Sequence, residues 1–332
     1  MSRPGSLITA LSLAAWTAVQ SGEPPAEPAD MGILVLELEN DLFAGEDRHY
    51  TNGVRASWIT PDGGVPGLLR DLGDLIPFFP GDGELKNSWS IGQNMYTPKD
   101  LRATEPDPDD RPYAGWLYVS GGLAEVTDRR MDRLQLTLGV IGPASLADKT
   151  QKEIHRIVGA PMPRGWDHQL GNEPTLMVSY ERQVRAWEHG TGTGWQMDVI
   201  THWGGTLGTP FTLINSGLTL RAGRNLPHGF GPSRIQPALP GSGMFVPRAR
   251  WGWYVFAGVD VRAVAWNVFL DGSTFRDSPG VDRRPFVGDA QAGAALSLGR
   301  TRLTYTHVFR SLEFTDQPER EDFGAVSLSW LF

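Results

Sequence analysis

The sequence contains no cysteine. Disulfides, thiol nucleophiles, thiolate zinc sites and the lipid-modified cysteine of a bacterial lipoprotein are therefore excluded. Dense runs of Lys and Arg are also absent, and the formal net charge is −8, which argues against a nucleic-acid-binding protein. The residues left for chemistry are histidines, carboxylates, hydroxyls and whatever metal ion these can hold.

Two common hydrolase motifs are missing as well. The pattern H-E-x-x-H does not occur, which disfavours a zinc peptidase, and no G-x-S-x-G elbow marks a serine nucleophile. After the first 20 or so residues, no segment is long enough to span a membrane as a helix without Gly, Pro or charge. If the protein crosses a membrane, it must do so with strands.

The N-terminal segment has the pattern of an export signal. An uncharged stretch follows Arg3 and ends at Gln20, and a Pro- and Glu-rich segment comes next. The stretch is shorter than the ~20 apolar residues of a spanning helix, so a short anchor or a buried helix is the weaker alternative. We interpret residues 1–22 as a signal peptide, 23–30 as a polar spacer and 31–332 as the folded domain.

The rest of the chain repeats units of alternating apolar and polar residues separated by turns. Residues 134–140 place three leucines and a valine on one face, and residues 326–332 alternate Val, Leu, Trp and Phe with small residues. A soluble β-sandwich would show the same alternation, with its apolar face turned inward. The export signal, the terminal Phe332 and Trp residues near strand ends favour an outer-membrane β-barrel.

About twelve strands are expected, an even number as in closed bacterial barrels. The candidates are residues 32–41, 50–60, 86–97, 112–126, 132–143, 173–185, 193–203, 211–222, 252–268, 287–297, 301–313 and 322–332. Strand parity then places the turns 41–49, 98–111 and 143–172 on one rim, facing the outside. Two connections on the opposite rim, residues 61–85 and 222–251, are long and rich in Gly and Pro, which favours extended coil.

Three turns on the outer rim carry candidate functional residues. Asn40 and Asp41 end a strand and face Thr51 on the next, an oxygen-rich set suited to calcium, although Asn and Asp also favour turns by themselves. Lys99 and Arg102 are able to hold a phosphate, but their loop also has the composition of an ordinary solvated turn.

The third of these turns contains the one convincing helix, residues 147–158, which Gly159 and Pro161 close. Gln151 and His155 are spaced i, i+4 and therefore share a face of this helix. A helix that carries a histidine above a barrel wall is unusual for a passive pore. The alternative is a surface helix whose histidine packs against a tryptophan.

These segments resemble the outer-membrane lipid A 3′-O-deacylases. The likeness rests on Asn40-Asp41, Tyr50 to Gly53, Ile141-Gly142-Pro143, Gln151 to Gly159 and Gly165 to Leu170, and it follows the strand order through most of the chain. The resemblance implies a twelve-stranded barrel with a calcium-dependent esterase site at its outer-leaflet rim. Such an enzyme removes the 3′-linked acyloxyacyl group of lipid A within lipopolysaccharide.

The resemblance also implies roles for individual residues. His155 corresponds to the general base that activates water, Gln151 to its support and Asn40 to a neighbour in the site. Asp41 corresponds to a calcium ligand, and Thr51 to a hydroxyl beside the reacting centre; the sequence leaves open whether water or Thr51 is the nucleophile.

The pattern of this family differs from the sequence at one important position. An acidic residue is expected six positions beyond the histidine, and this chain has Pro161 there. The nearest later carboxylates are Asp167 and Glu173, and we take Glu173 as the candidate second metal ligand. Lys99 and Arg102 match the family's basic pair, which would contact a substrate phosphate or core sugar, only approximately.

Three functions compete at this stage. The leading hypothesis is a monomeric calcium-dependent lipid A deacylase, integral to the outer membrane, with its site facing the outer leaflet. An outer-membrane phospholipase has the same export and metal requirements. The third possibility is a channel or structural barrel that binds divalent cations and lipopolysaccharide without catalysis.

Overall fold

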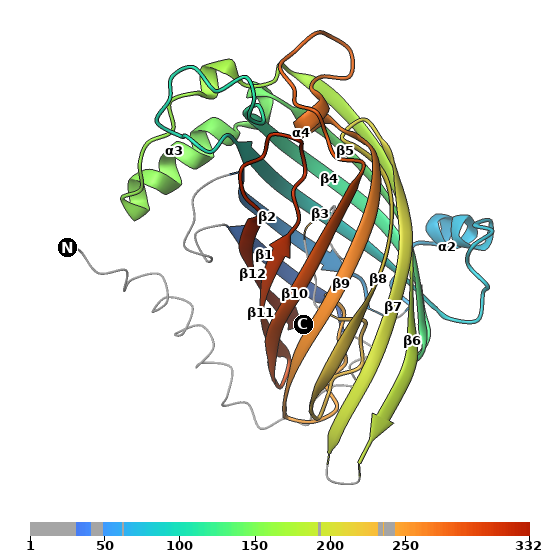
Figure 1. Cartoon of the computed structure of the whole chain (residues 1–332). Coiled ribbons are helices and arrows are strands. Elements are labelled where there is room, and N and C mark those ends of the chain that lie inside the picture. Colours follow the sequence, from blue (N-terminus) through green and yellow to red (C-terminus); the bar gives the residue numbers. More distant parts are fainter. Residues whose placement is uncertain (1–30, 41–48, 62, 192–193, 232–234, 236–242) are drawn as a thin grey trace.

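The described part of the chain forms a closed barrel of antiparallel strands (Figure 1). This structure is a computed structural model, and it describes residues 31–40, 49–61, 63–191, 194–231, 235 and 243–332. Each strand pairs with its neighbours in sequence, and β1 pairs with β12 to close the ring. We call the end where β1 begins and β12 ends the terminal end, and the opposite end the loop end.

The strands and helices have the following bounds. The strands are β1 (Ile33–Asn40), β2 (His49–Ile59), β3 (Glu84–Thr97), β4 (Ala114–Val126), β5 (Arg130–Ile141), β6 (Glu173–Gly190), β7 (Trp195–Gly208), β8 (Phe211–Arg224), β9 (Trp251–Asn267), β10 (Phe286–Leu298), β11 (Thr301–Arg310) and β12 (Glu321–Leu331). The helices are α2 (Gly67–Asp74), α3 (Ala147–Val158) and α4 (Val268–Asp271), with short 3₁₀ turns η4 (Pro143–Ser145) and η5 (Trp166–His168).

The barrel turns its apolar side chains outward. In β1, Leu36 and Leu38 are exposed on the outer face, whereas Glu37 and Glu39 are buried in the lumen. Strand alternation repeats this arrangement around the ring, as expected where lipid rather than water covers the wall. Among the described residues, no helix is both long and apolar enough to cross a membrane.

The predicted strands and the predicted helix are confirmed. The twelve strands lie where expected, and α3 has the bounds that the sequence indicated. The strands β6 and β7 continue to Gly190 and Gly208, five residues beyond their predicted ends at 185 and 203. The predicted signal peptide and spacer lie outside the described residues.

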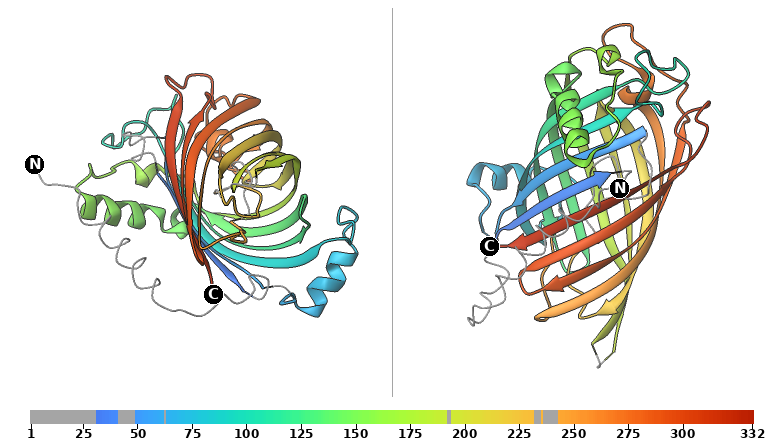
Figure 2. Two further views of the ribbon diagram at one scale, coloured as in Figure 1. Left: turned by 90° about the horizontal axis from the view of Figure 1, so that it is seen from below. Right: turned by 90° about the vertical axis from the view of Figure 1, so that its left-hand side faces the viewer.

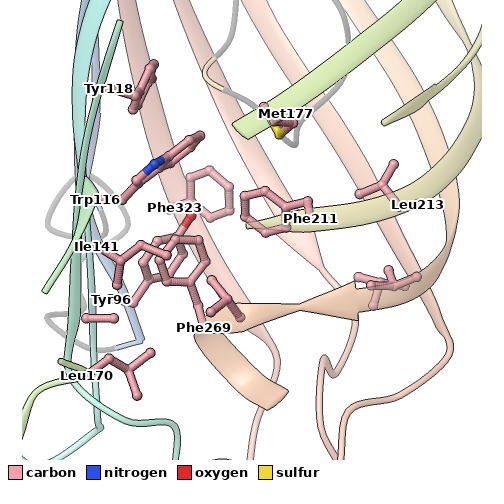
Figure 3. Close-up of a cluster of buried hydrophobic side chains, with 14 of the residues drawn as sticks. Tyr96, Trp116, Tyr118, Ile141, Leu170, Met177, Phe211, Leu213, Phe269 and Phe323 are labelled. Atoms are coloured by element: carbon pink, nitrogen blue, oxygen red, sulfur yellow. The ribbon is translucent and has the colours of Figure 1, made fainter. Parts of the chain in front are cut away.

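Aromatic side chains fill the lumen at the loop end (Figure 3). Tyr96 stacks on Phe269 with ring centroids 4.0 Å apart, and Trp116 stacks on Tyr118 at 4.2 Å. Phe211 joins them from β8, and Phe269 comes from α4, which follows β9 inside this cluster. This end of the barrel is therefore packed rather than open.

The connection after β8 fills the lumen at the terminal end. Phe245 packs in a buried cluster with the inner side chains of β1, β2 and β12, and the guanidinium of Arg302 lies over its ring. The carbonyl of Gly229 accepts hydrogen bonds from Arg185 and Arg221, and the amide of Ile235 donates to Glu39. Figure 2 shows this segment inside the ring of strands when the barrel is viewed from below. The expectation of simple extended coil between residues 222 and 251 is thus incomplete, because the described parts of this segment, which we call the plug, pack inside the barrel.

The other long connection, residues 61–85, also differs from the expected extended coil. It contains the helix α2, which lies outside the barrel (Figure 1). The helix is recognisable only in its tertiary setting, because two glycines in eight residues lower its intrinsic propensity. A Cβ on Gly73 would lie 3.0 Å from a methyl of Leu85, so the helix packs closely on the outer face of β3.

Candidate active site

The helix α3 lies against the outer face of the barrel at the loop end. It packs on β4 and β3 and stands outside the ring of strands in both views of Figure 2. Leu146, the residue before the helix, has a left-handed backbone conformation with φ 60°, and Gly159, the residue after it, has φ 74°. Its buried residues, Ala147, Gln151 and His155, recur every four positions and form a single stripe that faces the wall.

A glycine on the barrel wall allows this close approach. A Cβ on Gly115 of β4 would lie 2.2 Å from the Cβ of Ala147 and 2.3 Å from Oγ of Ser145. Beside it, Nε2 of Gln93 donates a 2.6 Å hydrogen bond to the carbonyl of Ser145. The start of α3 is therefore fixed to β3 and β4 by both close packing and a hydrogen bond.

His155 is oriented by the residue that departs from the family pattern. Its side chain is buried, and Nδ1 lies 2.6 Å from the carbonyl oxygen of Pro161. A carbonyl only accepts hydrogen bonds, so Nδ1 must carry a proton, and in the neutral ring Nε2 is then the nitrogen with the free lone pair. A backbone carbonyl thus holds the ring where an acidic side chain was expected, and the tautomer suits a general base.

Gln151 is held by a tryptophan. Its Oε1 accepts a 2.6 Å hydrogen bond from Nε1 of Trp166, whose ring packs against Tyr113 with centroids 5.0 Å apart. The side chain is 2% exposed, and its amide Nε2 makes no hydrogen bond in the described part of the chain. A buried donor without a partner is uncommon in folded proteins, and it marks a place where a ligand oxygen fits.

Two asparagines lie next to the wall residues on which α3 packs. Asn40 of β1 and Asn52 of β2 are directly opposed, and both are buried although they share the outward face with exposed Leu38 and Val54. The pairing continues from Asn52 to Met95 of β3 and from Met95 to Gly115, so one row of outward positions crosses four strands. The oxygen Oδ1 of Asn52 has no hydrogen-bond partner among the described residues.

The sequence did not single out Asn52 or Trp166 as functional residues. Both lie in segments that carry the family resemblance, yet neither was assigned a role. The available signal for Asn52 was a polar residue at a lipid-facing position of an alternating strand. For Trp166, the bonding of its indole to Gln151 fifteen residues earlier could not be read from local spacing.

The remaining predicted residues are distributed unevenly around the site. Asp41 lies outside the described residues, and Thr51 lies in β2 next to Asn52, with its side chain outside the described part. Glu173 is on the inner face at the start of β6, where its carboxylate accepts hydrogen bonds from the amide of Thr274, the shorter 2.9 Å long. The structure therefore does not bring Glu173 together with His155, because the barrel wall separates them.

The basic pair lies in the loop between β3 and β4. The ammonium of Lys99 is 3.1 Å from Oε1 of Glu319, and both side chains are exposed. Arg102 is also exposed, and the preceding Leu101 packs in a cluster with Trp166 and Ala147. Arg102 therefore lies next to the support of α3, whereas Lys99 points to the loop before β12.

The described residues contain no group of three or more His, Asp or Glu side chains that would form a complete metal site. They do supply amide oxygens on the outer wall, at Asn40 and at the unpartnered Asn52. Oxygen ligands of this kind suit a hard cation such as calcium when a carboxylate completes the set. Asp41, directly after Asn40, is the carboxylate that follows in the sequence.

Comparison with known proteins agrees with this architecture. Residues 7–332 match the family of outer membrane protein LpxR. The structure of LpxR from Salmonella typhimurium superposes with a TM-score of 0.74 at 19% identity, covering 90% of this chain and 100% of that chain. No curated protein matches the chain.

Two other solved barrels are much less similar. The beta domain of the Bordetella autotransporter Brka gives a TM-score of 0.44 at 10% identity, covering 91% of this chain and 99% of that chain. The translocator domain of the autotransporter NalP from Neisseria meningitidis gives 0.37 at 10% identity, covering 97% and 95%. The family match spans nearly the whole chain, and the chain therefore belongs to the family of outer membrane protein LpxR and is an integral outer-membrane β-barrel.

Proposed function

We propose that this protein is a lipid A 3′-O-deacylase, which hydrolyses the 3′-linked acyloxyacyl ester of lipopolysaccharide at the outer wall of the barrel. The observation that carries the proposal is the position of His155, which is buried between a helix and a lipid-facing wall with Nε2 available as a base. A water-soluble substrate would not reach His155 at this lipid-facing position. A lipid in the same leaflet reaches this site by lateral diffusion.

The proposed orientation follows from the ends of the chain. Outer-membrane barrels keep short turns and the termini on the periplasmic side and longer loops outside. The loop end, with α3, would then lie at the outer leaflet, where lipid A resides. The protein acts as a monomer in this proposal, since the described residues of one chain close the ring.

The reaction starts with the imidazole of His155. Its Nε2 takes a proton from water, and the oxygen of that water forms a bond to the ester carbonyl carbon. The resulting tetrahedral intermediate expels the sugar 3′-oxygen, which receives the proton from the imidazolium, and a free fatty acid is released. The carbonyl of Pro161 stabilises the ring in this orientation, and it also accepts from Nδ1–H of the imidazolium.

Gln151 is suited to the negative charge of the intermediate. Its unpartnered amide Nε2 donates hydrogen bonds, while Oε1 stays bound to Trp166. Donors that are held in place before the reaction stabilise an oxyanion strongly in a site that excludes water. The same amide is less useful to a binding-only barrel, which has no developing charge to meet.

The amide oxygens of Asn40 and Asn52, with the carboxylate of Asp41, are the residues that would hold calcium. When bound, the cation would supply positive charge that polarises the ester carbonyl. In the alternative that uses Thr51 as nucleophile, an acyl group would reside on Thr51 for part of each turnover. A Thr51→Val variant with full activity would remove that alternative.

Mass spectrometry of lipid tests the proposal. The purified protein is incubated in mixed micelles with lipid A or with glycerophospholipid, in calcium and then in excess chelator. We expect loss of one acyloxyacyl unit from lipid A in calcium only, and no release from phospholipid. Cleavage of phospholipid alone would favour a phospholipase, and an unchanged lipid A from folded protein would refute the deacylase.

A further inference from the structure

The segment around α2 has an exposed apolar face on the outside of the barrel at the terminal end. Leu68, Leu75 and Phe78 are 73%, 77% and 53% exposed. On the same helix, Arg70 is exposed on the opposite side of the helical wheel, whereas Asp71 lies beside Leu68 and Leu75 at i+3 and i−4. Three large apolar side chains presented together are unusual for a loop in water, and they require a covering surface.

The position of α2 places this face next to lipid. Gly73 packs on Leu85, an outward residue of β3, so the helix lies directly on the wall. The ring of Phe78 is 4.9 Å from that of Tyr180, which is 5.6 Å from Trp203. Tyr180 and Trp203 are outward aromatic residues of β6 and β7, and such residues mark the boundary between lipid and water in barrels. The apolar face of α2 is therefore continuous with the lipid-facing belt.

A row of charges on the wall confirms that this is the level of the boundary. One row of outer-face positions runs in register from β3 to β6. It begins at Leu85 and continues with the charged residues Glu125, Asp132 and Arg182. Arg182 donates to Asp132 at 2.6 Å, and one step toward the loop end the outward residues of β4 and β5 are Leu123 and Leu134. Charges of this kind belong at headgroup level.

Two residues of this charged row also hold the α2 segment against the wall by hydrogen bonds. The carboxylate of Glu125 accepts hydrogen bonds from three successive amides, those of Gly81, Asp82 and Gly83, at 3.0 to 3.1 Å. Arg182 donates to the carbonyl of Phe78 at 3.0 Å. The segment is therefore fixed against the wall, and its exposed leucines do not arise from a loop that extends freely into solvent.

We propose that α2 is an interfacial anchor, whose Leu68, Leu75 and Phe78 insert between the phospholipids of the leaflet at the terminal end. An amphipathic helix lies in the plane of the interface, with its apolar face among the acyl chains and its charges among the headgroups. Arg70, on the opposite side from Leu68 and Leu75, is placed for the headgroup side. The anchor enlarges the contact of the barrel with that leaflet on one flank, beside β3 to β6, and it acts independently of catalysis at the loop end.

Site-directed spin labelling tests the anchor. Because the chain has no cysteine of its own, each variant with one introduced cysteine is labelled at that position alone. Nitroxides are placed at Leu68→Cys and Leu75→Cys, with Arg70→Cys as the control on the opposite side of the helix. The folded protein is reconstituted in phosphatidylcholine vesicles, and accessibility to oxygen and to a water-soluble nickel chelate is measured. We expect an oxygen-to-nickel ratio at least about threefold higher at the leucine positions than at the control.

Two results would overturn the proposal. Equal nickel accessibility at all three positions would place the helix in water. Low accessibility to both reagents at Leu68→Cys and Leu75→Cys would mean that protein, either another copy or another segment of this chain, covers the face. Because neither result depends on lipid A hydrolysis, failure of the anchor and failure of the proposed enzyme are distinguishable.

Discussion

At the scale of single residues, the site depends on backbone and amide groups that support one imidazole. Pro161 supplies a carbonyl to Nδ1 of His155, and Trp166 fixes Oε1 of Gln151 so that its amide nitrogen is directed elsewhere. A carbonyl carries less charge than a carboxylate, so it fixes the tautomer while stabilising the imidazolium less. The departure at Pro161 therefore changes the strength of the support but preserves its geometry.

The amide nitrogen of Gln151 is tested by an almost isosteric change. Gln151→Glu keeps an oxygen that accepts from Trp166 but removes the donor that we assign to the oxyanion. We expect kcat for lipid A deacylation to fall by about 10²–10³-fold, the usual loss when one such donor is removed. Lys152→Gln on the partly exposed side of the same helix should leave kcat unchanged. Full activity of Gln151→Glu would show that the nitrogen has no part in the reaction.

The sequence identified the Gln151 and His155 pair because i, i+4 spacing on a helix is a local property. It did not identify Asn52 or the role of Trp166, because their importance depends on which residues lie opposite across a sheet or loop. It assigned Glu173 as a metal ligand from its nearness in sequence to Pro161. The structure shows why nearness was insufficient, since strand alternation puts Glu173 on the other side of the wall.

At the scale of elements, the seating of α3 on the barrel is the critical contact. Gly115 leaves space that Ala147 and Ser145 occupy. Gly115→Ala should move the helix away from the wall and lower deacylation on the order of 10²-fold, because a displacement of about 1 Å is enough for such a loss. Gly288→Ala on the outer face of β10 is the control, as its Cβ would have no neighbour nearer than 3.8 Å.

Circular dichroism and heat stability should remain those of a folded barrel in both variants, since the strands themselves are not altered. Unchanged activity of Gly115→Ala would contradict the inference that tight seating of α3 positions His155. Loss of activity in Gly288→Ala as well would point to a general effect of added methyl groups on the wall.

The ion pair of Asp82 with Arg130 gives the α2 segment a pH dependence. A hydrogen bond from Arg130 lowers the pKa of Asp82 to about 2, from an ordinary value near 4. A carboxyl with a lowered pKa stabilises the folded state above its ordinary value, and the contribution disappears as the pH falls through about 2. We expect Asp82→Asn to lower Tm at neutral pH, and the difference from wild type to vanish in strong acid.

Thermal unfolding in detergent from neutral pH downward measures this difference. Asp71→Asn, an exposed change on α2, is the control for the loss of one surface carboxylate. A difference for Asp82→Asn that stayed constant or grew as the pH fell would contradict the role of its charge.

Strand positions were predictable from sequence because alternation repeats at every strand and is imposed by the lipid on one side. The helix α2 was not predictable, since its stability comes from packing on Leu85 and from the hydrogen bonds at Glu125. The same holds for the plug after β8, whose contacts with Arg302, Glu39 and Arg185 join residues far apart in the chain.

At the scale of the whole molecule, buried side chains close both ends of the lumen, and the reactive residues are outside it. Aromatic rings close the loop end, the plug closes the terminal end, and ion pairs such as Arg55 with Glu37 lie between them. Buried charges of this kind are satisfied by one another rather than by water. This arrangement favours a solid scaffold that presents a site to lipid.

The closed ends of the lumen predict that the protein does not conduct ions. Purified protein inserted into a planar bilayer should give no steady conductance, while a general porin in the same bilayer gives stable open steps. Because the plug is held by contacts at several strands, it should stay in place at moderate voltage. A steady open state of the wild-type protein would support the channel hypothesis and weaken the scaffold account.

The measurement that tests the central claim most directly is mass spectrometry of lipid A after incubation with wild-type protein and with His155→Ala, in lipid vesicles with calcium. The account predicts release of one acyloxyacyl unit by the wild type and a rate lower by about 10²–10⁴-fold in the variant, as for the loss of a general base. Arg156→Ala, whose side chain is exposed on the same helix, should act like wild type. A folded His155→Ala variant that still removed the acyl unit at the wild-type rate would contradict the account.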